Sequence, residues 1–272
     1  MTSDEFDDIG SFIQSQFGIK MPPSKKTMLQ SRLTKRLRAM NMSSYGQYRE
    51  YLFSQEGLDQ EVPFMIDVVT TNKTDFFREP SHFALLREVM LPLWLRQTGG
   101  GEIFNIWSAG CATGEEPYTM AMVLNEFAEA EPDFRFSILG TDISGEALEK
   151  AVEAIYRESR SDGIPEALKK KYLMRSKDRK QGLVRIVPEL RSTVIFERLN
   201  LMGDFSSVVG KKDVIFCRNV IIYFERPVQE LLFEKCCRCL KTGGYLFIGH
   251  SETLSGMRLP LMQVKPTVYQ KI

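Results

Sequence analysis

The stretch Ile103–Asp142, IFNIWSAGCATGEEPYTMAMVLNEFAEAEPDFRFSILGTD, decides the fold of this 272-residue chain. It opens with an apolar run of strand length, 103–107, and a glycine-containing turn, 108–114. Apolar residues then recur at helical spacing after Pro117, which suits a first helical turn because its missing N–H would have no partner there. A second apolar run, 134–139, again has the length of a strand. The order strand, turn, helix, strand predicts a parallel β-α-β unit.

Such a unit holds a nucleotide at its glycine turn. Gly110 allows close approach of the backbone, and the helix N-terminus presents free N–H groups. Asp142, at the end of the second strand, is placed to accept hydrogen bonds from both ribose hydroxyls. Glu115 and Glu116 would repel a pyrophosphate but suit a ligand with positive charge, which favours S-adenosylmethionine over NAD. The alternative is that the acidic pair merely complements the helix dipole.

Composition places the chain among ordinary globular proteins. It is 43% hydrophobic and 26% charged, with a net charge of +1, and its length suffices for one large domain or for a large domain with a small one. No apolar run approaches the ~20 residues of a membrane span, and the acidic start MTSDEFDD does not resemble a signal peptide. We therefore expect a cytoplasmic protein without membrane insertion.

The chain has five cysteines, an odd number that favours reduced thiols over a disulfide framework. The cluster Cys236, Cys237 and Cys239 has the composition of a zinc site. However, leucines and a phenylalanine flank it in a helical pattern, and the chain has only two histidines. Core packing is therefore favoured, and we expect no metal site.

Residues 1–72 are predicted to form a small all-α domain. Its first helix stops at Gly18, and Ser24 is a candidate cap for a second helix over 25–40. Further helices are expected around 44–53 and 59–69.

The second helix carries a basic patch. From Lys20 to Arg49 there are eight basic residues and no acidic one. Because like charges repel one another unless something compensates them, an acidic partner surface is favoured over a solvated face. The predicted docking residues lie opposite a stripe of leucines and are Arg32, Lys35, Arg36 and Arg38.

Residues 73–101 are predicted to contain a polar loop, an apolar helix around 83–95 and a glycine linker. Residues 102–272 continue the α/β pattern, with a helix over 145–156 capped by Ser144. Further apolar strands each end in polar residues, which is typical of a doubly wound sheet with its site along that edge. These strands lie at 194–196, 214–216, 244–248 and 267–271.

An insertion interrupts this alternation between 157 and 192. A charged helix over 165–174 precedes a half-exposed strand at 183–187, which predicts a small antiparallel β unit at about 175–192. The edge of this unit could accept a peptide by strand addition, or the unit could be a simple hairpin.

Five short segments occur in order along the chain: NKTDFFRE (72–79), SAGCATGEEPYT (108–119), TDIS (141–144), CRNVIIYF (217–224) and GHSE (249–252). Together they resemble the chemotaxis receptor methyltransferases (CheR), which methylate glutamates on chemoreceptors. The resemblance covers essentially the whole chain. It implies a Rossmann-like class I methyltransferase fold, S-adenosylmethionine as methyl donor and S-adenosylhomocysteine as product.

The resemblance also implies site residues by motif position. Arg78 and Tyr223 are the candidate catalytic residues, holding the reacting carboxylate near the transferred methyl group, although each could instead bind the cofactor or pack structurally. The implied cofactor-binding residues are Asn72, Thr74, Arg78, Gly110, one of Glu115 and Glu116, Asp142, Asn200, Leu201, Arg218 and Asn219.

The implied partner is the helical cytoplasmic region of a chemoreceptor, with a C-terminal tethering peptide of the receptor as a candidate ligand of the β insertion. We expect a monomer that does not bind nucleic acid.

The chemistry of methyl transfer to a glutamate carboxylate is consistent with this residue set, and that argument does not depend on the family resemblance. A glutamate side chain, with a pKa of about 4.3, is already an anion at neutral pH and needs no general base. His250-Ser251-Glu252 is too compact in sequence for a catalytic relay, so a structural role at a strand end is favoured. Two alternatives stay open. One is an RNA methyltransferase that tracks phosphates with the basic helix, and the other is a non-catalytic adenosylmethionine-sensing scaffold.

Overall fold

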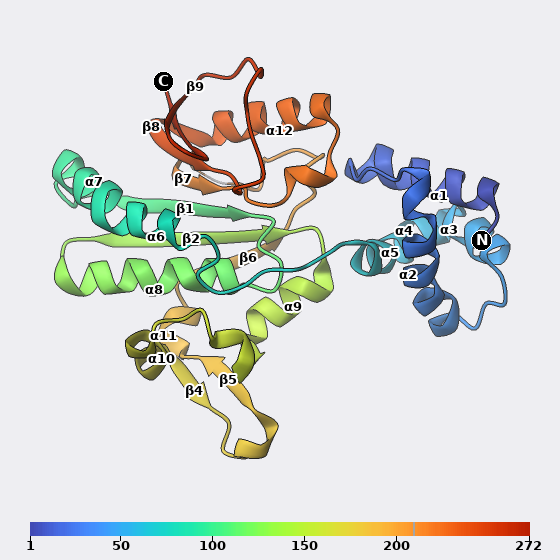
Figure 1. The fold of residues 1–272 in the computed structure, drawn as a ribbon, viewed down its shortest axis with the longest axis horizontal. Coiled ribbons are helices and arrows are strands. Elements are labelled where there is room, and N and C mark those ends of the chain that lie inside the picture. The colour runs from blue at the N-terminus through green and yellow to red at the C-terminus, as the bar shows by residue number, and fades with distance from the viewer. Residues whose placement is uncertain (209) are drawn as a thin grey trace.

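The computed structural model describes residues 1–208 and 210–272. A helical N-terminal domain lies beside an α/β body, and a small antiparallel sheet projects from the body below helix α8 (Figure 1). An extended segment joins the N-terminal domain to the body and crosses the edge of the main sheet where strands β1 and β2 end (Figure 1).

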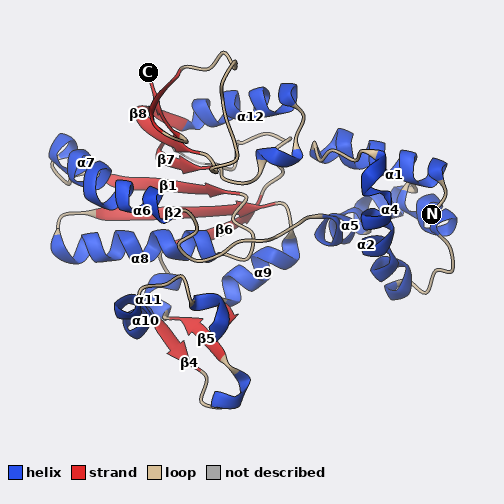
Figure 2. Cartoon of the chain, in the orientation of Figure 1, coloured by secondary structure: helices blue, strands red, loops and turns tan. Residues whose placement is uncertain are grey.

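Within the described residues, seven strands form the main sheet in the order β6-β2-β1-β7-β8-β10-β9. Figure 2 shows its strands β1 and β2 running between helices α6 and α8. Neighbours from β6 to β8 pair in parallel, and β10 is antiparallel to both of its neighbours. The expected doubly wound sheet is confirmed, with β9 as an unexpected strand whose mostly exposed side chains leave no apolar run to find. The strands are β1 (Ile103–Ala109), β2 (Arg135–Asp142), β6 (Val194–Arg198), β7 (Lys212–Phe216), β8 (Leu240–Phe247), β9 (Leu261–Lys265) and β10 (Val268–Lys271).

Helices cover both faces of this sheet because successive strand residues point to opposite sides. Phe216 faces a core shared with α8 (Glu115–Ala130), whereas its strand neighbour Ile215 faces a core shared with α12 (Arg226–Cys239). The cysteine cluster belongs to α12, where Cys236 and Cys237 are buried, so the core-packing interpretation is confirmed for these two residues.

The helix before β1 is not continuous. The sequence predicts one helix around 83–95, but the chain forms α6 (Pro80–Leu85), a π-helical turn η2 (Leu86–Met90) and α7 (Leu91–Thr98). Pro92 lacks an N–H and its ring would clash with a carbonyl one turn earlier, so the backbone widens just before it.

The N-terminal domain is helical as predicted, with two local differences. Ser24 does not cap a helix but lies in a 3-10 turn, and no side chain caps α2. The helix expected over 59–69 is split before Pro63, which occupies the first turn of α5. The helical elements are α1 (Ser3–Phe17), η1 (Pro23–Lys25), α2 (Lys26–Ala39), α3 (Tyr45–Leu52), α4 (Gln55–Gln60) and α5 (Val62–Val69).

The insertion is larger than the range 175–192 predicted for it. Helix α9 ends at Glu153 because Ala154 adopts a left-handed conformation, with φ at 54°. Tyr156, expected in that helix, instead lies in a strand that pairs with β5, and the small antiparallel sheet has the order β3-β5-β4. Its elements are α9 (Gly145–Glu153), β3 (Ile155–Arg157), η3 (Glu158–Ser161), α10 (Glu166–Tyr172), β4 (Leu173–Arg175), η4 (Arg179–Gln181), β5 (Leu183–Ile186) and α11 (Pro188–Arg191).

Candidate active site

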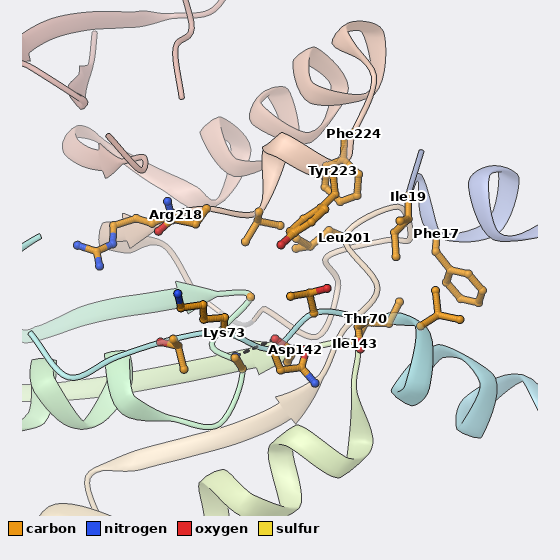
Figure 3. Close-up of a pocket in the computed structure, with 18 of the residues that line it drawn as sticks. Phe17, Ile19, Thr70, Lys73, Asp142, Ile143, Leu201, Arg218, Tyr223 and Phe224 are labelled. Atoms are coloured by element: carbon orange, nitrogen blue, oxygen red, sulfur yellow. Dashed lines mark hydrogen bonds between the residues drawn. The ribbon is translucent and has the colours of Figure 1, made fainter. Parts of the chain in front are cut away.

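A crevice opens where the order of the main sheet reverses. From β1 the chain moves outward to β2 and β6, and from β7 it moves outward in the opposite direction to β8 and β10. The loops that follow β1 and β7 therefore diverge, and ligands of open α/β sheets bind at such a point. Figure 3 shows the cavity at this position, with Asp142 and Lys73 on one side and Arg218 and Tyr223 on the other.

The cavity is open to solvent at its mouth, and residues of both the N-terminal domain and the α/β body line it. Its lining contains all the predicted catalytic and cofactor-binding residues except Glu115. The predicted residues in the lining are Asn72, Thr74, Arg78, Gly110, Glu116, Asp142, Asn200, Leu201, Arg218, Asn219 and Tyr223.

The glycine turn uses its backbone donors internally. The N–H groups of Gly110 and Cys111 both donate to Thr141 O, at 2.8 and 2.9 Å. The N–H of Ala112 donates to Asp142 Oδ2 at 2.8 Å. These donors are therefore not free to cradle a pyrophosphate, which supports the preference for a ligand without one.

Asp142 is buried, with 8% of its surface exposed, and burial raises the pKa of its carboxyl group while backbone hydrogen bonds oppose that shift. Besides Ala112, the N–H of Ser144 donates to Asp142, reaching Oδ1 at 2.9 Å. A carboxylate offers about four acceptor positions, so both oxygens retain capacity for the two hydroxyls of a ribose.

The two glutamates at the start of α8 point in different directions. Glu116 lines the cavity and accepts hydrogen bonds from Ser108 Oγ at 2.7 Å and from Arg218 Nε at 2.9 Å. Glu115 is 1% exposed and accepts from Thr113 Oγ1 at 2.6 Å and from Arg160 Nη2 at 2.7 Å. Each carboxylate is already paired with an arginine, Glu115 with Arg160 and Glu116 with Arg218. The negative charge that this acidic pair offers to a cationic ligand is therefore smaller than the sequence alone indicates.

The loop 72–79 crosses the mouth of the cavity in a strained conformation. Phe77 and Glu79 have φ angles of 54° and 58°, which residues with a side chain rarely adopt. The N–H of Phe77 donates to Thr119 Oγ1 at 3.1 Å, and Arg218 Nη2 donates to Arg78 O at 2.7 Å. Such strain persists only where neighbouring structure holds it, and it is concentrated at functional sites.

The N-terminal domain supplies a wall that the sequence did not predict. Asn200 Nδ2 donates to Gln16 O at 2.9 Å, and the N–H of Lys20 donates to Tyr223 O at 2.9 Å, so the domain is docked on the body. No local pattern reports this contact, because it depends on how two separately folded units pack. The wall residues are Phe17, Ile19, Met21, Lys25 and Met28.

Tyr223 directs its hydroxyl into the cavity (Figure 3). Its ring lies beside Lys25, whose Nζ is 5.9 Å from the ring centroid. Burial, with the nearby Arg32 and Lys20, lowers the pKa of Lys25. A phenol and an ammonium from different domains thus converge on one side of the cavity.

The basic helix α2 does not present all its charges to solvent. Arg32 donates to the carbonyls of Val69 and Thr70, closing the end of α5, and Arg36 forms a two-point ion pair with Glu61, at 2.8 and 2.7 Å. Arg32 and Arg36 therefore have structural contacts, and the expectation that all four basic residues lie on a free outer face is wrong for these two.

Lys35 and Arg38 are exposed, as predicted. The leucine stripe of α2 is buried, also as predicted: Leu29, Leu33 and Leu37.

Glu79, His82 and His250 place one ligand atom each within 4.8 Å of one another. A cation already occupies this cluster, because Arg218 Nη1 lies 3.0 Å from His82 Nδ1 and 3.7 Å from Glu79 Oε2. We therefore assign Glu79 and His82 to the support of Arg218 rather than to a metal ion.

The carboxylate of Glu252 orders the strand ends beside the cavity. It accepts N–H bonds from Gly249 at 2.6 Å, Asn219 at 2.9 Å and Ile221 at 3.0 Å. The structural interpretation of the segment 250–252 is confirmed for Glu252.

The sheet order and the pocket at its switch point define a Rossmann-like fold, and the family match below makes it that of an S-adenosylmethionine-dependent methyltransferase. Residues 72–270 match the family description "CheR methyltransferase, SAM binding domain", and residues 4–70 match "CheR methyltransferase, all-alpha domain". The chain therefore belongs to the CheR methyltransferase family.

Three similar proteins align with this chain over most of their own length. It is 39% identical to a chemotaxis protein methyltransferase of Borreliella burgdorferi, over 100% of this chain and 95% of that protein. It is 36% identical to chemotaxis protein methyltransferase 2 of Pseudomonas aeruginosa, over 98% and 93%. It is also 36% identical to the chemotaxis protein methyltransferase of Escherichia coli, over 97% and 89%. Among the described residues, no helix combines the length and apolar character needed to cross a membrane.

Proposed function

We propose that this chain transfers the methyl group of S-adenosylmethionine to glutamate carboxylates on the cytoplasmic helices of chemoreceptors, giving glutamyl methyl esters for chemotactic adaptation. Family membership supports methyl transfer, and the names of the relatives support chemotaxis as its setting. The observation that carries the choice of substrate is the charge around the cavity. Lys25, Lys73 and Arg78 line it, and among the described residues none of the three has a carboxylate within 4.0 Å. These cations suit an acceptor that is itself an anion.

The cavity residues divide between cofactor and substrate. In this proposal Asp142 holds the ribose, and Asn200 and Leu201 flank the adenine. Glu116 faces the amino-acid part of the cofactor, while Arg218 keeps Glu116 in place. The remaining cofactor contacts come from the loop 72–79 and from the strand ends. The residues are Asn72, Thr74, Gly110 and Asn219.

The chemistry requires alignment rather than proton removal. S-adenosylmethionine supplies a methyl group bonded to a sulfonium, and the glutamate oxygen is already ionised at neutral pH. Arg78 and Tyr223 orient that carboxylate, Arg78 by charge and Tyr223 by a hydrogen bond. The apolar wall from the N-terminal domain excludes water, which would otherwise stabilise the separated charges of the reactants more than the transition state.

Two further contacts with the receptor belong to the proposal. Lys35 and Arg38 are the docking residues, because they are exposed and lie on the helix that leads away from Lys25. The free edge of the small sheet at β4 accepts a tethering peptide by strand addition, supported by the position of β4 at one end of the order β3-β5-β4. We propose that the enzyme acts as a monomer in the cytoplasm.

A transfer assay with methyl-labelled cofactor tests the proposal. Receptor cytoplasmic fragments, the same fragments with their candidate glutamates changed to alanine, and total RNA are offered separately as acceptors. We expect base-labile label on the wild-type fragment alone, since methyl esters hydrolyse in mild alkali. Label on RNA would support the alternative methyltransferase, and cofactor binding without transfer to any acceptor would support the scaffold.

A further inference from the structure

Arg160 lies in the 3-10 turn η3 of the insertion, and its side chain contacts two segments that border the cavity. Its Nη2 donates to Glu115 Oε1 at 2.7 Å and also to the backbone carbonyl of Thr74, and its Nη1 lies 3.8 Å from Asp75 Oδ1. One guanidinium therefore bridges the first turn of α8 and the loop that crosses the cavity mouth. Thr74 itself lines the cavity.

Two neighbours of Arg160 strengthen the same junction. Tyr156 donates its hydroxyl to Thr113 O in the glycine turn at 2.8 Å, and its ring meets Phe76 of the loop edge to face, with centroids 5.0 Å apart. At Gly163 a Cβ atom would lie 2.5 Å from Phe76 O, so no other residue permits this approach without displacing the loop. The insertion is thus packed against the loop and the turn.

We infer that Arg160 is a positioning residue for cofactor binding, through which the insertion holds the loop 72–79 closed over the cavity. The inference rests on the proposed function in taking this cavity as the cofactor site. Arg160 does not touch the cavity; it acts through Thr74 and Glu115. Its effect is therefore on cofactor affinity, with a smaller effect on the methyl-transfer step once the cofactor is bound.

The charges explain why an arginine is needed at this position. Glu115 is 1% exposed, and a buried carboxylate requires a partner with both charge and directed donors. The planar guanidinium can bond Glu115 and the carbonyl of Thr74 at once, whereas an ammonium on a flexible stem cannot reach both with the same geometry. The strained φ angles of Phe77 and Glu79 show that this loop needs support from outside itself.

The experiment compares Arg160→Gln with a matched control, Arg175→Gln. Arg175 lies in β4 of the same insertion, is 70% exposed, and pairs with Glu158 of the insertion rather than with the loop. We expect Arg160→Gln to weaken S-adenosylhomocysteine binding by about tenfold in calorimetry and to raise KM for the cofactor more than it lowers kcat. The control should bind like wild type, and Arg160→Lys should fall between the two because it keeps one of the contacts.

A double-mutant cycle and hydrogen exchange complete the test. Arg160→Gln and Glu115→Gln together should cost little more affinity than Arg160→Gln alone, since Arg160→Gln already removes the ion pair that Glu115→Gln disrupts. The amide of Phe77, which is bonded to Thr119, should exchange faster in Arg160→Gln and not in Arg175→Gln. The exchange measurement needs no ligand, so it tests whether Arg160 holds the loop 72–79 even if no receptor is methylated.

Wild-type affinity together with wild-type exchange in Arg160→Gln would overturn the inference. Equal losses in Arg160→Gln and Arg175→Gln would also overturn it, because the effect would then reflect the stability of the whole insertion. Failure of receptor methylation by the wild type, by contrast, concerns the proposed function alone.

Discussion

Arg218 Nε lies 2.9 Å from Glu116 Oε2, and this pair joins the end of β7 to the first turn of α8 across the crevice of the sheet. Both side chains are buried, with 2% and 11% of their surface exposed. Arg218 also donates to Arg78 O in the loop 72–79 and to His82 in α6. A single guanidinium therefore links the cavity to both segments. This buried ion pair therefore holds together the segments that border the cavity.

Glu116→Gln should disturb both binding and stability. The amide keeps the hydrogen bond from Ser108 but leaves Arg218 with only the more distant Glu79 as a counter-charge, at 3.7 Å. We expect a loss of roughly 1–3 kcal/mol in the free energy of unfolding and at least tenfold weaker binding of S-adenosylhomocysteine. Denaturant titration and calorimetry measure the two quantities. A variant with unchanged affinity would remove Glu116 from the cofactor site.

Asp142→Asn should weaken the cofactor complex by roughly 1–3 kcal/mol, because one oxygen that accepts a backbone N–H and faces the ribose becomes a donor. Asp213→Asn is the matched control. Asp213 is equally buried but accepts from Trp94 and from the N–H of Asn105 at the opposite end of the sheet. We expect the control to lose stability and retain affinity in calorimetry. Equal affinity in both variants would exclude Asp142 from the ribose contact.

Tyr223→Phe should separate binding from chemistry. The ring keeps its place beside Lys25, but the hydroxyl that points into the cavity is lost (Figure 3). We expect nearly unchanged cofactor affinity and a turnover lowered by about tenfold or more at saturating receptor fragment. If turnover is unchanged, Tyr223 is a packing residue.

The two kinds of basic residue on α2 should respond differently to charge reversal. Lys35→Glu/Arg38→Glu should keep the melting temperature and cofactor affinity, and methylation at low receptor concentration should fall about tenfold. The wild-type rate should also decline with salt, since exposed charges are screened within about 8 Å at physiological ionic strength.

Arg258→Glu/Lys265→Glu makes the same charge change at two exposed residues, one just before β9 and one in it, and should methylate normally. Arg36→Glu should instead destabilise the N-terminal domain by roughly 3 kcal/mol, because it leaves Glu61 buried and unpaired. If the Lys35 and Arg38 variant methylates receptor normally at low salt, docking lies elsewhere.

His82 should make stability depend on pH. Burial, and then the charge of Arg218, lowers the pKa of His82 to about 4, whereas Glu79 raises it and His250 lowers it slightly. The unfolded chain therefore binds a proton at His82 from about pH 6.5 downward, and the folded chain does not until about pH 4. The free energy of unfolding should fall by roughly 1–2 kcal/mol between pH 7 and pH 5.

Denaturation of His82→Gln at the two pH values should show a smaller fall than the wild type. His250→Gln, which changes a ring with 57% exposure, should behave like the wild type. A wild-type pH dependence in His82→Gln would assign the effect to other groups.

Local spacing sufficed to predict much of the site. The glycine turn after β1, the acidic residue ending β2 and the segment after β7 each follow an apolar strand, and parallel strands carry such residues to one edge. For that reason Gly110, Asp142 and Arg218 are found on one cavity without any knowledge of the packing between domains. The helical stripe of α2 was predictable for the same reason, since its period reports which face is buried.

Other properties of the site depended on contacts between segments far apart in the chain. Glu115 and Glu116 are neighbours with the same chemistry, and only the positions of Arg160 and Arg218 decide which of them faces the cavity. Arg36 has the sequence context of a free surface charge, yet Glu61, 25 residues away, draws it inward.

The sequence by itself thus determined the parallel sheet, the edge that carries the site and the residue types found there, because these follow from strand and helix periodicity. Tertiary structure alone decided how the N-terminal domain closes the cavity and how the insertion holds the loop 72–79. The first depends on how two separately folded units pack, through contacts such as that of Asn200 with Gln16. The second depends on Arg160 meeting Glu115 across the fold, and the energy of such an ion pair is a property of distance and burial rather than of the order of residues.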